Sequence, residues 1–434
     1  MKQTVAITTL GCKTNQFESA AMAEILGKEE FRVIPFSEPA DIYVINTCTV
    51  TARTDAESRK LIRRAQRQNP AARIVVTGCY AQLAPDRIRE MPEVDLIFGN
   101  AEKKEIATLL RETVNGPQVV VSDIAAESAA VRLPLESFAE HTRAFLQIQN
   151  GCDAFCSYCI VPYARGKSRS VPPADVLAGI DAFAAQGFLE VVLTGIHLGC
   201  YGLDLTPPTS LLALLTVAEE ARLVPRLRVG SVEPMEVSPE FIRFLAGSRT
   251  VCPHLHIPLQ SGSGAVLARM NRHYSRDSFR AVVEKLVADV PGICIGCDVI
   301  AGFPGETDAE FAEGLGFIAS LPVAYLHVFP FSPRPGTPAA TMAGQVEPAV
   351  SRERAAVLRQ LGEKKRLAFY RSFVGRELEV LVQEREGSGR LRGISRNYIP
   401  VQLAGGDELI NSETVVKVVG ANRQGVRGER VRGG

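Results

Sequence analysis

Three cysteines in one short segment, Cys152, Cys156 and Cys159, have the spacing CxxxCxxC. Cysteine thiolates are the ligands of iron–sulfur clusters, and three of them leave one iron of a four-iron cluster without a protein ligand. A closed structural site uses four protein ligands, whereas a site that binds a reactant keeps one position open. The spacing therefore predicts a cluster with one iron free for a reactant.

The cysteine triplet directly follows the first strand of a predicted β/α repeat that extends over residues 143–370. The six expected strands are residues 145–149, 190–194, 226–230, 254–258, 293–300 and 325–330. Helical segments such as residues 172–186 and 277–290 separate them, so we expect a partial (β/α)6 barrel. Chemistry in barrels of this type occurs at the carboxyl ends of the strands, which is where the triplet lies.

Residues 1–115 contain three more cysteines, each placed just after a strand-like run: Cys12, Cys48 and Cys79. Strands are expected at residues 5–10, 41–46, 73–78 and 94–98, with helices between them, which is typical of an open parallel α/β sheet. The carboxyl ends of parallel strands share one edge of the sheet, so the three cysteines can converge. The alternative interpretation is that they are small hydrophobic residues at strand ends.

The remaining segments predict a linker and a small basic barrel. Residues 116–142 lack periodicity and are expected to be a linker. A helix over residues 351–370 leads to residues 371–434, where period-two alternation and glycine-rich turns predict a small antiparallel β-barrel. The arginines and lysine of this barrel suggest a surface for a phosphate backbone, and the alternative is an ordinary solvated tail. They are Arg390, Arg392, Arg396, Lys417, Arg423, Arg427, Arg430 and Arg432.

Composition restricts the class of protein. A chain of 434 residues predicts two or three domains, and 46% hydrophobic with 22% charged residues is typical of a globular protein. No apolar run is long enough for a membrane span, and the chain enters a strand-like run without a leader, so a cytoplasmic protein without a membrane partner is expected. Ten cysteines then indicate metal or redox chemistry before disulfides.

Taken together, these motifs resemble the radical S-adenosylmethionine (SAM) methylthiotransferase family over nearly the whole chain. The resemblance lies in TLGCKTNQFES at residues 9–19, the segments ending at Cys48 and Cys79, GCDAFCSYC at residues 151–159, and the basic barrel, which is similar to a TRAM domain. It implies two 4Fe-4S clusters. SAM would fill the open site of the first, and Cys12, Cys48 and Cys79 would hold the second, auxiliary cluster.

Several stretches, such as residues 161–166 and 193–202, resemble the branch that acts on N6-threonylcarbamoyladenosine next to the tRNA anticodon. The resemblance implies transfer of a methylthio group to C2 of that base, with an electron donor such as flavodoxin or ferredoxin. The C2–H bond has no acidic proton, so a radical supplied by a cofactor is needed. Alternative substrates are N6-isopentenyladenosine in tRNA and a ribosomal protein aspartate. An RNA-binding protein with purely structural clusters would need a closed four-ligand site.

Four residues are candidates for the SAM pocket. Tyr158 is expected near the adenine of SAM, and Gly195 ends the second strand, where the missing Cβ would let the amino group of SAM approach. Ser231 and Glu233 close the third strand and are expected at the ribose or carboxylate of SAM. No catalytic side chain is predicted beyond the cluster ligands.

Other residues have less definite roles in the sequence. Arg165, Lys167 and Arg169 follow the cysteine triplet and are expected either to hold the SAM carboxylate or an RNA phosphate, or to be solvated. His197 and Cys200 match no metal-ligand spacing, so they are interpreted as structural residues. Arg392 and Arg396 of the barrel are expected to contact RNA.

Overall fold

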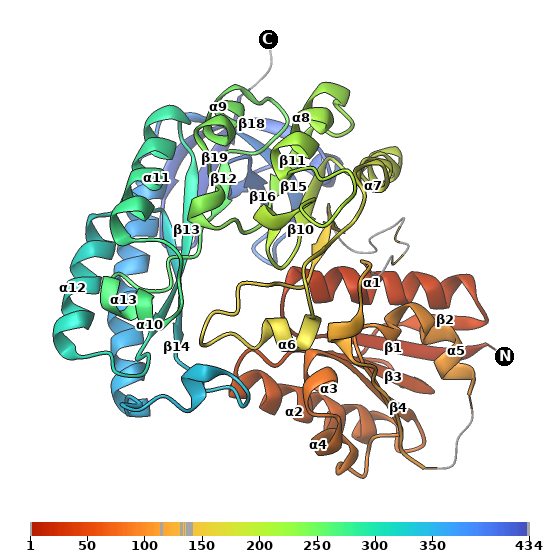
Figure 1. The fold of residues 1–434 in the computed structure, drawn as a ribbon. Coiled ribbons are helices and arrows are strands. Elements are labelled where there is room, and N and C mark those ends of the chain that lie inside the picture. The colour runs from red at the N-terminus through yellow and green to blue at the C-terminus, as the bar shows by residue number, and fades with distance from the viewer. Residues whose placement is uncertain (1, 113–115, 131–132, 134, 136–141, 432–434) are drawn as a thin grey trace.

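A computed structural model describes residues 2–112, 116–130, 133, 135 and 142–431 of the chain. Its first unit, red and orange in Figure 1, is a six-stranded parallel sheet in the order β2-β1-β3-β4-β5-β6. The strands are β1 (Gln3–Thr9), β2 (Phe31–Ile34), β3 (Ile42–Thr47), β4 (Arg73–Gly78), β5 (Leu96–Phe98) and β6 (Gln118–Val120). This arrangement confirms the predicted open parallel α/β sheet.

Helices cover both faces of this sheet, which explains the continuous apolar runs of its central strands. Tyr43 and Ile45 of β3 pack with Ile62 of α2, whereas Val44 packs with Met22 of α1 on the opposite face. A parallel strand that is buried on both faces has no polar alternation. The helices of this unit are α1 (Lys13–Lys28), α2 (Ala52–Gln68), α3 (Cys79–Leu83), α4 (Pro85–Arg89), η1 (Glu102–Glu105) and α5 (Ile106–Arg111).

Two strands of this sheet were not expected from the sequence. The short edge strand β2 is half exposed and carries too few apolar residues for a clear pattern. Strand β6 lies in residues 116–142, which the sequence predicts as a linker, and it pairs with β5 through Leu96 and Gln118. The first part of that segment therefore completes the N-terminal sheet.

The central unit is an open barrel of six parallel strands. Two three-stranded sheets, β11-β10-β7 and β12-β13-β14, are joined by single bridges that pair Leu227 with Val251 and Ser231 with His256. This confirms the predicted partial barrel. The strands are β7 (Arg143–Gln147), β10 (Glu190–Thr194), β11 (Arg226–Val229), β12 (His254–His256), β13 (Cys294–Ala301) and β14 (Tyr325–Pro330).

Helices surround the outside of this barrel, and α1 lies along its first strand. The helices are α7 (Pro173–Ala185), α8 (Leu211–Ala221), α9 (Pro239–Gly247), α10 (Gly264–Arg269), α11 (Arg276–Asp289), α12 (Asp308–Ser320) and α13 (Pro348–Arg371). Strands β7 and β14 are the two edges; α1 packs against β7 and α13 against β14 (Figure 1). Phe17 and Ala21 of α1 belong to the central hydrophobic core. The N-terminal unit is thus attached at the open side of the barrel.

The C-terminal unit is a closed five-stranded barrel in the order β15-β16-β17-β19-β18, drawn in blue in Figure 1. Its pairs are antiparallel except β17 with β19, which is parallel. The strands are β15 (Glu377–Arg385), β16 (Leu391–Ser395), β17 (Pro400–Leu403), β18 (Glu413–Ala421) and β19 (Val426–Arg430). Because β19 closes the barrel, the basic residues up to Arg430 belong to the folded barrel and not to a solvated tail. Arg432 lies outside the described residues.

A buried ionic cluster fastens this barrel to the central unit. Glu190 at the start of β10 accepts hydrogen bonds from Arg226 Nε and Arg228 Nε, both at 2.8 Å, and all three side chains are inaccessible to solvent. The two guanidiniums also donate to the carbonyl oxygens of Ile394 and Arg396 in the C-terminal barrel, both at 3.0 Å.

None of the described helices is long and apolar enough to cross a membrane.

We expect Glu190→Gln to lower the free energy of unfolding by about 3–5 kcal/mol, because it removes the buried carboxylate that the guanidiniums of Arg226 and Arg228 share and leaves Arg226 only the partly exposed Glu413. Urea unfolding of the purified protein measures this as a lower midpoint. The control is Glu240→Gln, which removes an exposed ion pair with Arg243 and should change the free energy by less than about 1 kcal/mol. Equal midpoints for the two variants would contradict the structural role of Glu190.

Candidate active site

The predicted cluster loop lies between β8 (Gln149–Asn150) and α6 (Val161–Arg165), at the carboxyl end of β7. Gly151 begins the loop at φ 75°, and a Cβ there would lie 1.8 Å from the carbonyl oxygen of Lys167, so only glycine fits. The amide of Cys159 donates to the carbonyl of Cys156 at 2.9 Å, which tightens the turn between these two residues. This local geometry brings the second and third thiols of the triplet together.

The three thiols of the loop fit the donor set of a cluster with one open iron. Burial raises the pKa of Cys159 to about 12, and the neighbouring Cys156 and Cys152 contribute in the same direction. A bound cationic metal centre reverses this preference because it stabilises the thiolate form. Arg272 Nη1 donates to Cys156 Sγ at 3.2 Å, so a permanent positive charge already faces one of the sulfurs.

The predicted SAM residues lie around this loop. Tyr158 packs against the small apolar cluster that contains Met270 and Phe303. A Cβ on Gly195 would lie 2.6 Å from Leu198 Cδ2 and 3.0 Å from Gln149 Oε1, so the protein's own packing requires this glycine. The atoms that approach Gly195 closely therefore include side chains of the protein itself, in addition to any ligand.

Ser231 and Glu233 have different surroundings. Ser231 is exposed and pairs with the backbone of His256 at the junction between β11 and β12. Glu233 forms an ion pair with Arg272, the same side chain that donates to Cys156. Burial raises the pKa of Glu233, against the opposing effect of Arg272. Glu233 thus orients a cluster-facing arginine, which the sequence did not indicate.

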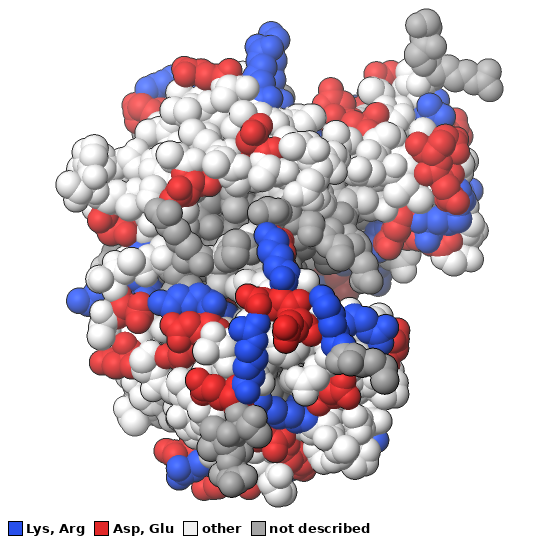
Figure 2. Space-filling view, turned by 90° about the vertical axis from the view of Figure 1, so that its right-hand side faces the viewer, with Lys and Arg blue, Asp and Glu red and all other residues white. Residues whose placement is uncertain are grey.

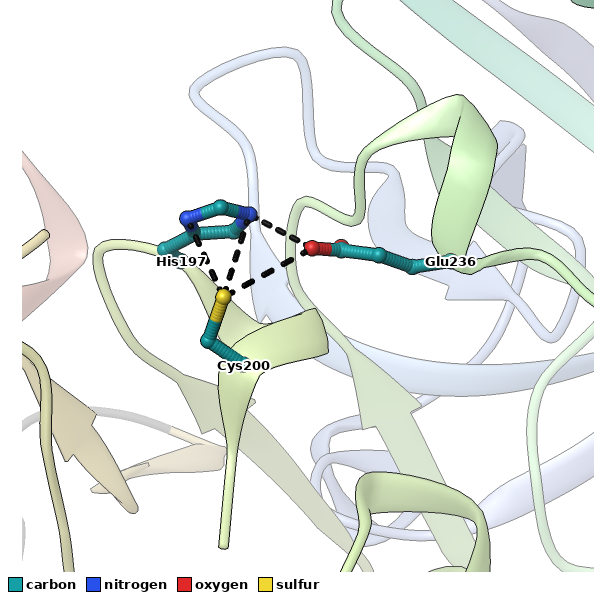
Figure 3. A group of neighbouring side chains, drawn as sticks. All are labelled: His197, Cys200 and Glu236. Atoms are coloured by element: carbon teal, nitrogen blue, oxygen red, sulfur yellow. Dashed lines mark hydrogen bonds and ion pairs between the residues drawn. The ribbon is translucent and has the colours of Figure 1, made fainter. Parts of the chain in front are cut away.

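His197 and Cys200, which the sequence indicates as structural residues, form one group with Glu236 (Figure 3). His197 Nδ1 lies 3.6 Å from Cys152 Sγ, and its Nε2 lies 2.5 Å from Glu236 Oε1. Cys200 Sγ lies 3.5 Å from His197 Nδ1 and 3.9 Å from Glu236 Oε1. His197 is therefore part of the site rather than a remote core residue. Its position two residues beyond Gly195, at a strand end, was the signal that could have identified it.

The second cysteine triad forms at the edge of the N-terminal sheet. Strands β1, β3 and β4 are neighbours, so Cys12, Cys48 and Cys79 follow three adjacent carboxyl ends. Burial raises the pKa of Cys48 to about 12, and Cys79 and Cys12 are close enough to contribute. Cys48 and Cys79 are buried, whereas Cys12 is exposed.

Two glycines allow these strand ends to approach. Gly11 has φ 105°, and a Cβ there would lie 2.9 Å from Cys48 Sγ. Gly78 has φ 96°, and its Cβ would lie 2.3 Å from the carbonyl oxygen of Thr47. A side chain at either position would force the triad apart, so the backbone is shaped for three convergent thiols.

A buried ion cluster connects the two cysteine triads. Arg165 at the end of α6 donates to Glu18 Oε1 at 2.6 Å and to Asn15 Oδ1, both on α1, and Lys103 also pairs with Glu18. Burial alone would raise the pKa of Glu18, but Arg165 and Lys103 lower it to about 2. The guanidinium of Arg165 is paired within this cluster. Arg165 is therefore neither a contact for SAM or phosphate nor a solvated charge, and both expectations for it are wrong. Arg169 is also buried.

A cavity of about 480 Å³ extends from the second triad to the predicted SAM residues, a size that suits a small molecule. Its wall includes Cys12 of the second triad, and also Gly195 and Ser231 of the predicted SAM site. The strands of the barrel contribute polar and aromatic side chains to the same wall: His254, His256, Asp298, Tyr325 and His327, with Tyr398 from the C-terminal barrel. Asp298 Oδ1 is 3.0 Å from His256 Nε2 and 3.4 Å from His327 Nδ1.

Two further hollows continue from this cavity towards the C-terminal barrel. The first hollow has a volume of about 230 Å³ and shares Tyr325, His327 and Tyr398 with the cavity. The second hollow has a volume of about 540 Å³ and shares Arg366 and Arg392 with the first hollow. The face of the molecule shown in Figure 2 differs from these arginine-lined hollows, because acidic and basic side chains are interspersed on it. The hollows therefore provide a polar, arginine-lined route to the cavity.

Arg396 does not face this route. Only 17% of its side chain is exposed, and it donates to the carbonyl oxygens of Pro225 and Thr250 at 3.2 and 3.1 Å. The expectation that Arg396 contacts RNA is therefore replaced by a role in joining the two barrels. Cys252, Cys294 and Cys297, which belong to neither triad, are buried in the core.

Comparisons with known proteins agree with this architecture. Residues 4–99 match the model described as "Uncharacterized protein family UPF0004", and residues 146–318 match the radical SAM superfamily. The chain is 38% identical to the threonylcarbamoyladenosine tRNA methylthiotransferase MtaB of Aquifex aeolicus (strain VF5) over 93% of this chain and 98% of that protein. It is also 38% identical to MtaB of Bacillus subtilis (strain 168), over 99% of this chain and 96% of that protein.

Two other similarities are informative. A tRNA-2-methylthio-N(6)-dimethylallyladenosine synthase of Parafrankia sp. (strain EAN1pec) is 38% identical over 92% of this chain and 82% of that protein. The solved structure of the radical SAM methyltransferase TsrM from Kitasatospora setae superposes with a TM-score of 0.57 at 18% identity, covering 78% of this chain and 77% of that chain. The structural likeness supports the fold alone.

We expect Arg272→Met to lower the reduction potential of the cluster at the first triad by on the order of 60 mV, because a cationic donor to Cys156 is lost. The measurement is a redox titration followed by electron paramagnetic resonance, in a background where Cys12, Cys48 and Cys79 are alanine. Arg280→Met on the exposed face of α11 is the control. An unchanged potential at full iron content would show that the Arg272 contact does not influence the cluster.

Proposed function

The chain belongs to the radical SAM methylthiotransferase family, and we propose that it adds a methylthio group to C2 of N6-threonylcarbamoyladenosine next to the anticodon of tRNA. The observation that carries this proposal is the single cavity whose wall joins Cys12 of the second triad to Gly195 and Ser231 of the predicted SAM site. A base held there meets all three residues. Such a position suits a reaction that needs both a radical and a sulfur donor.

In this proposal the two triads hold two 4Fe-4S clusters. Cys152, Cys156 and Cys159 hold the cluster whose open iron binds SAM, and Cys12, Cys48 and Cys79 hold the auxiliary cluster. When bound, the first group supplies the electron that cleaves SAM, and the second supplies the sulfur that is transferred. The protein supplies position, because the second triad follows three adjacent strand ends and one of its cysteines, Cys12, reaches the cavity that Gly195 also lines.

The remaining side chains bind and orient the reactants. Tyr158, Gly195, Ser231 and Glu233 hold SAM beside the first triad, and Arg272 keeps a positive charge at Cys156. The aromatic wall of the cavity stacks on the target base and excludes water from it, as aromatic side chains do for unstacked bases in other RNA-binding proteins. Asp298 fixes the orientation of His256, which faces the same space.

Each segment of the chain has its own role in this proposal. Residues 1–115 carry the auxiliary cluster, 116–142 complete the N-terminal sheet through β6 and lead to the core, 143–370 form the radical SAM core and 371–434 form a TRAM domain that binds the anticodon stem-loop. An electron donor such as flavodoxin or ferredoxin reduces the cluster of the core. The equal identity to a dimethylallyladenosine synthase makes the isopentenyl nucleoside the second substrate to test.

The direct test is mass spectrometry of nucleosides from tRNA incubated anaerobically with the reconstituted protein, SAM and a reductant. Parallel reactions use tRNA with threonylcarbamoyl or isopentenyl adenosine. We expect a methylthio mass gain on the threonylcarbamoyl nucleoside. A gain on the isopentenyl nucleoside alone would overturn the substrate assignment, and SAM cleavage without any gain would leave only the radical core.

Variants of single cysteines separate the two triads in the same reactions. Cys156→Ala should abolish both 5′-deoxyadenosine formation and methylthio transfer. Cys79→Ala should retain 5′-deoxyadenosine formation but lose the transfer, because only the auxiliary triad is incomplete. Cys294→Ala, in the buried core, is the control and should retain both. Transfer by the Cys79 variant would contradict the role of the second triad.

RNA binding is expected to depend on Arg392, half of whose side chain is exposed at the hollows of the barrel. Arg392→Ala should weaken binding of the anticodon stem-loop and reduce the slope of log K against log salt by about 1, because one phosphate contact is lost. Fluorescence anisotropy over a salt series measures both quantities. Arg243→Ala, an exposed arginine of α9 in the central unit, is the control. Identical slopes for the Arg392 variant and the wild type would exclude a phosphate contact.

A further inference from the structure

Lys13 is a positively charged side chain in the wall of the active-site cavity. It is the first residue of α1, next to Cys12, and its half-buried side chain lines the same 480 Å³ space as Gly195 and Ser231. Among the described residues, none forms a hydrogen bond or a close ion pair with its ammonium group. A partly desolvated ammonium without a close counter-ion is costly, so this position favours an anionic ligand.

The surroundings of Lys13 add positive charge. Arg143 lines the adjoining hollow, and Arg228 lies behind Tyr398, with its guanidinium carbon 5.0 Å from the ring centroid. The nearby carboxylate of Glu190 is shared by Arg143, Arg226 and Arg228, at 3.5, 2.8 and 2.8 Å. Glu413 also pairs with Arg226, at 2.8 Å, so two carboxylates balance these three arginines and the excess charge beside Lys13 stays positive.

The other titratable groups of the wall do not cancel this excess. Asp298 is hydrogen-bonded by His256 and His327, as described above. Burial, and then the positive charges of Arg228 and Lys13, hold the pKa of His254 well below its usual range. His254 is therefore neutral, and it lies in the positive field of this part of the wall.

We propose that Lys13, supported by Arg143 and Arg228, binds the carboxylate at the end of the N6 substituent of the target nucleoside. The inference rests on the proposed function, in which the substituent is a threonylcarbamoyl group with one carboxylate and one hydroxyl. An isopentenyl substituent has no charge and gains nothing from this wall. The cationic wall thus selects between the two nucleosides on which the relatives of this chain act.

A carboxylate in this cavity has two possible sources, the nucleoside and SAM. The two are distinguished by an anticodon stem-loop RNA whose threonylcarbamoyl group is a methyl ester, because esterification removes the charge of the nucleoside alone. The reconstituted enzyme is assayed for kcat/KM of methylthio transfer and for RNA affinity with the acid and the ester. SAM affinity is measured separately without RNA.

We expect the wild type to lose about ten- to a hundredfold in kcat/KM on the ester, the range of a hydrogen bond to a charged group. Lys13→Met should lose the same factor on the acid but lose nothing further on the ester. Arg143→Gln, on a different element, should show a smaller loss of the same kind. Lys28→Met, at the exposed end of the same helix, is the control and should behave as the wild type.

Iron content and the visible absorption spectrum verify that the Lys13 variant keeps both clusters, because Cys12 is adjacent. Equal losses on acid and ester for Lys13→Met would overturn the proposal, as would a wild type that does not distinguish the two RNAs. Weaker SAM binding by the variant without RNA would assign the carboxylate to SAM and also overturn it. A wild type that modifies only isopentenyl RNA would instead refute the proposed function itself.

Discussion

The buried ion cluster of Glu18, Arg165 and Lys103 is the interaction on which the site depends. Glu18 and its neighbour Asn15 lie on the helix that starts at Cys12, and Arg165 ends the helix that follows the first triad. Removing one partner of such a cluster leaves a buried charge, which costs about 3–5 kcal/mol. The cluster therefore fixes the two triads relative to each other, because neither segment can move without exposing or isolating a charge.

This constraint explains why the cavity has its shape. Helix α1 is held at the open side of the barrel by Phe17 and Ala21, whose burial places Cys12 at the rim of the interior. Gly11 and Gly78 allow the strand ends to approach, and Gly195 does the same on the opposite wall. The open barrel edge, which would otherwise admit water, is thus closed by the element that carries the second triad. Positioning and exclusion of solvent have a common structural cause.

Much of this organisation could be predicted because it follows local patterns. Strand β10 and strand β14 were predicted to the residue; the CxxxCxxC spacing identified the first triad, and the repeated placement of a cysteine after a strand identified the second. Strands β2 and β6 were missed because they are short edge strands, and β16 and β19 because arginine and glycine interrupt their apolar pattern. The partners of Arg165 and His197 could not be predicted, because Glu18 and Glu236 are far away in the chain and meet them only after the units pack. Charge pairing of this kind carries no periodic signal.

Charge pairing between distant residues also explains why the arginines of this chain have different roles. Arg165, Arg226, Arg228 and Arg396 each join units of the structure through hydrogen bonds to carboxylates or carbonyl oxygens. A count of cations therefore overestimates the surface available to RNA. Two cations remain after these pairings: Lys13 in the cavity and Arg392 at the hollows of the barrel, which is half exposed with its Nη1 3.6 Å from Oε1 of the exposed Glu384. Because the joining arginines are largely buried with their partners, these two cations are the ones available to a substrate that carries phosphates and a carboxylate.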